Sequence, residues 1–180
     1  MPSKKRCKVP GAAALRIELL EDRRLLSGGS SLVLPAALPN VAAEEQLFVY
    51  ELNRARHDPV AYELEQNLSV DLSYVEPRPP LAVNGNLFDS AKFHAGEMAT
   101  YDYFAHQSAV TGDWPNKMAR DHGYELSQHW EDDKNYIESI AGGYATTLDS
   151  LNGLIVDEGV PSLGHRIHLL GIDDFSSNDR

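Results

Sequence analysis

The sequence predicts a single, mostly helical domain of the α+β class. A chain of 180 residues has the length of one ordinary domain, which buries roughly two thirds of its unfolded surface. Apolar residues recur at helical spacing in several segments, whereas only residues 136–141 have the composition of an internal strand. No repeat of solenoid or propeller period is present. One compact unit is therefore expected.

The first two helices are expected between residues 43 and 64. Apolar side chains at i, i+4 and i+7 predict one buried stripe along residues 43–56: Phe48, Leu52 and Ala55. Asp58 then precedes Pro59, which combines an N-cap candidate with a proline at the first helical position. We expect a short second helix to follow, extending to Leu64.

Three further helices are expected in the second half of the chain. One has a face spaced by four, three, four and three residues: Leu87, Ala91, His94, Met98 and Tyr101. Asn86 is its cap candidate. Another begins at Pro115, and Gly123 suits the left-handed residue that follows a helix end. The last carries Leu148, Leu151 and Ile155 and ends before Gly159.

Charge and composition divide the chain. Residues 1–27 hold seven Lys or Arg against three Asp or Glu, which leaves a net charge of about −15 for residues 28–180. Such an acidic body would repel phosphate backbones, so no nucleic-acid partner is expected. The Gly, Ser and Pro content of residues 28–42 predicts a linker, and residues 173–180 resemble a solvated tail. No apolar run reaches the length of a transmembrane helix.

Residues 15–27 read LRIELLEDRRLLS. They closely resemble the short amino-terminal motif of planctomycete extracellular proteins, which implies export and an extracellular location. Residues 1–27 are therefore expected to serve export and sorting outside the folded domain. Cys7, the sole cysteine, lies in this segment, so the domain can form no internal disulfide.

Four sequence blocks occur in the order typical of one family: residues 52–56, 80–106, 135–141 and 157–166. The last reads DEGVPSLGHR and the third NYIESIA. Together they resemble the CAP superfamily, which includes the cysteine-rich secretory proteins, antigen 5 and plant pathogenesis-related protein 1, in its bacterial form. The resemblance covers residues 43–172 and implies an α-β-α sandwich. The chain after residue 172 offers no further strand of the kind this family has, so a C-terminally shortened sheet is expected.

The resemblance implies a cavity lined by two histidines and two carboxylates, which fall on His106, Glu138, Asp157 and His165. Glu158 is the alternative to Asp157, because neighbours on a helix lie about 100° apart. Two neutral imidazoles with carboxylates are a donor set that suits Zn²⁺. A carboxylate that is not a ligand would instead orient an imidazole from outside the coordination shell.

Other histidines are interpreted as structural. His94 lies on an apolar helix face, where a hydrogen-bonded core histidine is expected. His168 follows His165 by three residues and could share its helical face, but an exposed position is expected for it. His57, His122 and His129 lie in polar or turn-like surroundings.

Three functions remain open from the sequence. The first is a non-enzymatic extracellular module that binds a metal or a small ligand such as a lipid or sterol, ligands implied by the resemblance. The second is a hydrolase with Glu138 as general base, acting with a histidine or a metal-bound water. The third is a structural cell-surface module. The binding module is preferred, because the sequence has no Gly-x-Ser-x-Gly elbow and no cysteine within the domain.

Overall fold

The computed structural model describes residues 15–18 and 41–173. Within these ranges the chain is helix-rich, with a small antiparallel sheet, so the coarse α+β class is confirmed. The elements along the chain are β1 (Leu15–Glu18), α1 (Ala43–His57), α2 (Pro59–Gln66), α3 (Gly85–Tyr101), α4 (Pro115–Asp121), β2 (Glu138–Ala141), α5 (Thr147–Val156) and α6 (Gly164–Leu170).

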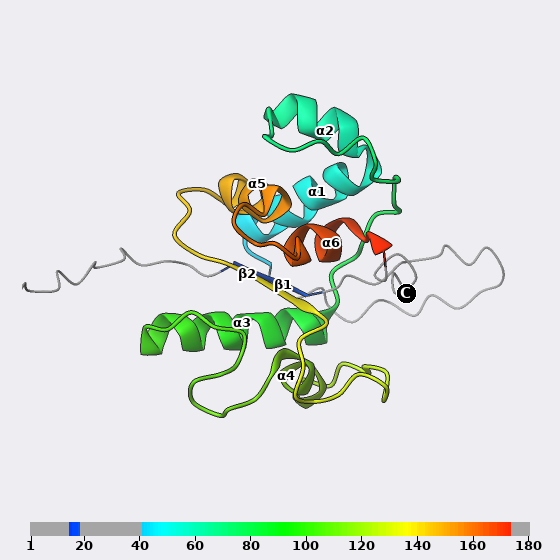
Figure 1. Cartoon of the computed structure of the whole chain (residues 1–180). Coiled ribbons are helices and arrows are strands. Elements are labelled where there is room, and N and C mark those ends of the chain that lie inside the picture. Colours follow the sequence, from blue (N-terminus) through cyan, green and yellow to red (C-terminus); the bar gives the residue numbers. More distant parts are fainter. Residues whose placement is uncertain (1–14, 19–40, 174–180) are drawn as a thin grey trace, which may run out of the picture.

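The two strands lie between two groups of helices. Strands β1 and β2 pair antiparallel, with Leu15 opposite Ala141 and Glu18 opposite Glu138. Helices α5 and α6 contact β2, while α3 contacts β1. Figure 1 shows α3 and α4 on one side of this ribbon and α1, α5 and α6 on the other. Side chains at the start of β2 can therefore reach both helical groups.

The larger core lies on the α1 side of the sheet. The predicted stripe of α1 is buried there, together with residues of α2, α5 and α6. Asp58 caps α2 as predicted, since its carboxylate accepts from the Ala61 amide at 3.0 Å and Pro59 opens the helix. The buried Arg56 donates to the carbonyl of Leu169 at 2.9 Å, which ties α1 to α6.

The smaller core lies on the other side, around Leu87, Ala119 and Ile137. Helix α3 begins earlier than predicted, because Asn84 rather than Asn86 accepts from the first free amides. Asn86 instead donates to the Gly123 carbonyl. Tyr101, expected on the buried stripe, is largely exposed.

Strand β1 was not expected from the sequence. It falls within residues 1–27, the segment that the sequence assigns to export, and its backbone completes a ladder with β2. Cys7, most of the predicted linker at residues 28–42 and nearly all of the predicted tail at residues 173–180 lie outside the described residues. Helix α1 begins at Ala43, where the domain is expected to start.

Helix α6 was also not predicted, and it is joined to α5 by a short, tightly bonded segment. Helix α5 ends at Val156, and Asp157 adopts a left-handed conformation with φ 54°. The buried Arg166 donates to the carbonyls of Ile155 and Val156, which satisfies acceptors that the end of α5 leaves free. The junction fixes the start of α6 relative to α5.

None of the helices in the described ranges combines the length and apolar character that a membrane crossing requires.

Candidate functional site

Glu138 enters the site from the first position of β2. The side-chain oxygen of Asn135 accepts from the amides of Ile137 at 3.3 Å and Glu138 at 2.9 Å, which shapes the turn before the strand. The Glu138 side chain is fully buried. A carboxylate buried in this way needs partners that donate hydrogen bonds, because an unpaired buried charge is strongly unfavourable.

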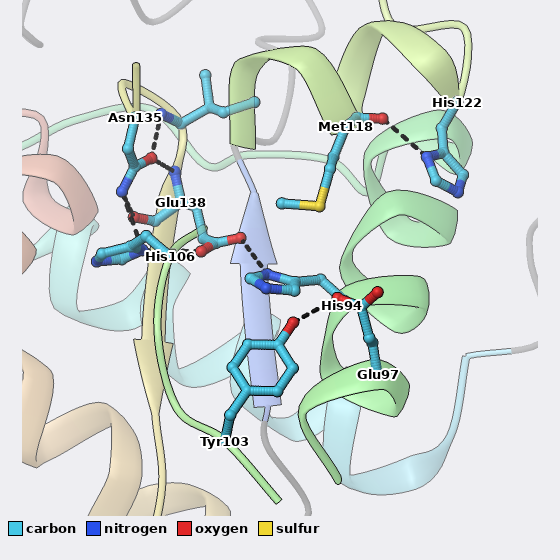
Figure 2. A network of polar contacts seen from close by, with 9 residues as sticks. His94, Glu97, Tyr103, His106, Met118, His122, Asn135 and Glu138 are labelled. Carbon is cyan, nitrogen blue, oxygen red and sulfur yellow. Dashed lines mark hydrogen bonds and ion pairs between the residues drawn. The ribbon is translucent and has the colours of Figure 1, made fainter. Parts of the chain in front are cut away.

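Two histidines supply these partners (Figure 2). His94 on α3 places Nδ1 3.0 Å from Glu138 Oε2, and His106 places Nδ1 2.8 Å from Oε1. A carboxylate only accepts hydrogen bonds, so each ring carries its proton on Nδ1. The Asn135 amide also lies 3.0 Å from His106 Nδ1 but donates to the Glu138 carbonyl. His106 Nε2 is left with a lone pair.

A second histidine and carboxylate pair forms at the junction of α5 and α6. Asp157 is buried, and its Oδ1 lies 2.7 Å from His165 Nδ1. Its other oxygen accepts from the amides of His165 at 3.0 Å and Arg166 at 3.4 Å, in the first turn of α6. Asp157 thus caps the helix and orients the ring that the helix carries. His165 also keeps its Nε2 lone pair.

Both pairs open on one cavity of about 380 Å³. Its walls come from the turn before β2, the start of the strand, the α5–α6 junction and α6, and the lining residues include His106, Asn135, Glu138, Ser139, His165 and His168. The side chains of His106 and His165 are 33% and 24% exposed. Within the described residues no protein group bonds Nε2 of either ring. Two unprotonated nitrogens therefore remain free to bind a ligand.

Of the four residues named from the sequence, His106, Glu138 and His165 line this cavity, while Asp157 lies behind His165. Glu158, the alternative to Asp157, is exposed and lines a neighbouring cavity. The choice between them had assumed that both lie on a helix. That assumption is wrong, since α5 ends one residue earlier.

His94 is the buried, hydrogen-bonded core histidine that the sequence predicts, and its partner is the site carboxylate Glu138. Its Nε2 is buried without a hydrogen bond in the described part of the chain. The sequence carried a signal for this link, because a histidine on an apolar stripe requires a polar partner. The identity of that partner depends on how α3 packs against the sheet.

The expectation that His168 is exposed is wrong. His168 is buried on α6, where Nδ1 lies 2.8 Å from Ser139 Oγ. Burial, followed by the nearby His165 and Arg56, lowers its pKa to about 4. His168 is therefore a neutral ring in the cavity wall at neutral pH. His165 and His168 are three residues apart on α6, so both rings lie on the side of the helix that faces the cavity. The sequence did not predict this helix.

Tyr103 and Glu97 form a separate polar contact beside His94, as Figure 2 shows, and the Tyr103 ring lies 6.0 Å from the His94 ring. The Tyr103 hydroxyl donates to the Glu97 carboxylate. Burial, followed by this hydrogen bond, raises the pKa of Tyr103 to about 12. The phenol therefore stays protonated and holds the chain just before His106.

The histidines and carboxylates of the site fit one kind of metal site and not another. Within residues 15–18 and 41–173, no three His, Cys, Asp or Glu side chains are grouped so that they could hold one ion. Both carboxylates already engage the Nδ1 atoms, which is the arrangement of groups that orient metal-binding imidazoles. The two free Nε2 atoms fit an open site that an outside ligand or water completes. They do not fit a closed structural site of four protein ligands.

Comparison with known proteins found no matching family model, no matching curated protein and no matching solved structure.

Proposed function

We propose that this chain is an extracellular, non-enzymatic binding module that holds a divalent transition metal, zinc in the first place, through His106 and His165. The observation that carries this proposal is the shared cavity, on which two imidazoles open with their Nδ1 atoms tied to carboxylates. When bound, zinc would act as a Lewis acid that accepts an electron pair from a small ligand. Glu138 and Asp157 would orient the rings.

The position of Glu138 supports binding over catalysis. A general base must reach a substrate proton or a water with a free lone pair. The Glu138 side chain is fully buried, and each of its oxygens accepts from a histidine. Its contacts are those of a group that fixes two rings, which favours the binding module over the hydrolase.

We further propose that the domain is a CAP-type module. This rests on the four sequence blocks and is supported by the placement of helices on both sides of the strand that carries Glu138. The extracellular location rests on the resemblance of residues 15–27 to an export motif. Lipid or sterol ligands remain proposals that rest on the family resemblance.

Zinc should stabilise the domain. A ligand that binds only the native state adds RT ln(1 + [L]/Kd), or about 2.7 kcal/mol at a hundredfold excess over Kd. Thermal melts with and without zinc at pH 7.5 measure this gain. Because protons compete for the same ring nitrogens, the gain should shrink as pH falls through about 6.5.

The matched variants are His106→Ala/His165→Ala and His57→Ala/His129→Ala. Each pair removes two histidines, but His57 and His129 are exposed and lie outside the cavity. The first pair should abolish the zinc response, and the second should retain it. Coinciding wild-type melts, or equal responses from both pairs, would reject the metal site and favour a purely structural role for the four residues.

A further inference from the structure

A second cavity of about 590 Å³ lies beside the first and shares with it Val160 and His165. Its size is typical of a small-molecule pocket. Phe104 and Tyr144 line it, and they are 57% and 50% exposed. Two large aromatic side chains are thus available to a ligand at the same cavity.

Glycine makes room for both rings. A Cβ at Gly153, inside α5, would lie 2.2 Å from the Tyr144 hydroxyl oxygen, a distance that no structure tolerates. A Cβ at Gly142 would lie 3.1 Å from the Phe104 ring. Glycine inside a helix lowers stability relative to alanine. The position of Tyr144 against α5 therefore depends on a residue that is unfavourable for α5 itself.

The charged groups of this cavity are acidic. Asp157 and Glu158 line it, and among the residues that the structure describes no lysine or arginine does. Asp157 bonds the His165 ring, whereas the Glu158 side chain is exposed and forms no ion pair with another described residue. A carboxylate disfavours a fatty acid or another anion here. Aromatic faces with a nearby carboxylate are the combination that binds organic cations.

We propose that this second cavity binds a small organic cation of the quaternary ammonium type, with Phe104 and Tyr144 as aromatic contacts and Glu158 as the counter-charge. The cation contacts the negative faces of the rings, and Glu158 supplies the net attraction. His165 lies in the walls of both cavities, but the residues proposed to contact the cation, Phe104, Tyr144 and Glu158, are not the proposed zinc ligands. The two proposals can therefore be tested separately.

Titration with choline, followed by chemical shifts of the full chain, tests this proposal. The neutral probe 3,3-dimethylbutan-1-ol has the shape of choline without its charge, and it should bind at least tenfold more weakly. Tyr144→Leu and Glu158→Gln should each weaken choline binding about tenfold. Tyr74→Leu and Glu76→Gln alter an exposed tyrosine and an exposed glutamate outside both cavities, so they should leave choline binding unchanged.

Gly153→Ala separates binding from folding. The new Cβ should displace Tyr144 and weaken choline binding, while stability stays equal or rises because alanine favours helix. In thermal melts, zinc should stabilise these variants as much as it stabilises the parent protein. A failure of the choline proposal can therefore be distinguished from a failure of the metal site. The proposal is overturned if choline does not saturate in the millimolar range, if the neutral probe binds equally well, or if Tyr144→Leu, Glu158→Gln and Gly153→Ala all bind like the parent.

Discussion

His168 is a histidine that the fold holds neutral. Burial lowers its pKa from an ordinary 6.5 to about 4, and Ser139 Oγ lies within hydrogen-bonding distance of Nδ1 of the ring. In the unfolded chain the same ring takes up a proton near pH 6.5. Between these values the unfolded state binds more protons than the folded state. Stability therefore rises with pH across this window and is lost as pH falls through it.

We expect His168 to make the zinc-free protein less stable at pH 4.5 than at pH 7.5, by up to about 3 kcal/mol at 1.36 kcal/mol per unit of pKa shift. Urea unfolding at both pH values measures this difference. In His168→Gln the difference should be smaller, because glutamine does not titrate. The exposed His129→Gln is the control and should behave like the parent. Equal pH dependence in all three proteins would contradict the assignment.

At the level of single residues, residue type constrained what the sequence could predict. The sequence named His106, Glu138, Asp157 and His165 through the family resemblance and interpreted His94 as a core histidine. It misjudged His168, because exposure depends on what covers a residue. Residues 162–170 contain too short an apolar pattern to predict a buried helix.

Two side chains fix the junction of α5 and α6, one at the end of α5 and one at the start of α6. Arg166 caps the carbonyls of α5, and Asp157 caps the amides of α6 while it bonds the His165 ring. Asp157 also takes a left-handed backbone conformation, which asparagine adopts as readily. Asp157→Asn therefore tests the carboxylate without backbone strain.

Asp157→Asn should lower the free energy of unfolding by about 2 kcal/mol, since hydrogen bonds to a charged acceptor contribute about 1.5–3 kcal/mol. It should also weaken zinc binding, because the variant lacks the carboxylate that orients the His165 ring. Chemical unfolding and zinc titration measure the two effects. Glu158→Gln changes the exposed neighbour and should leave both values unchanged. Equal behaviour of the two variants would show that Asp157 has no special role at the junction.

At the scale of the whole molecule, the unexpected feature is strand β1. Composition placed residues 1–27 outside the domain, yet the backbone of Leu15–Glu18 pairs with β2, the strand that carries Glu138. Within the described residues this is the only strand paired with β2. The segment that resembles an export motif is therefore also part of the sheet.

Deletion of residues 1–18 should lower the free energy of unfolding by about 1–3 kcal/mol relative to deletion of residues 1–14, because each backbone hydrogen bond contributes about 0.5–1.5 kcal/mol net. Urea unfolding of both truncations measures the difference, and amide exchange of Glu138–Ala141 locates it. If both truncations unfold at the same urea concentration, the composition-based boundary near Ala43 describes the domain better than the pairing does.

The sequence by itself determined the coarse, helix-rich α+β class and the starts of α1, α2 and α4 to within a residue or two. It also proposed the histidines and carboxylates of the candidate site. These features depend on local spacing, capping chemistry and ordered motifs, all of which involve residues that lie close together in the sequence. Tertiary structure alone decided that Glu138 bridges His94 and His106, that His168 is buried, and that Phe104 and Tyr144 line one cavity. These relations join residues up to 44 positions apart along the chain. Hydrophobic burial has no direction of its own, and it determines which of these residues meet.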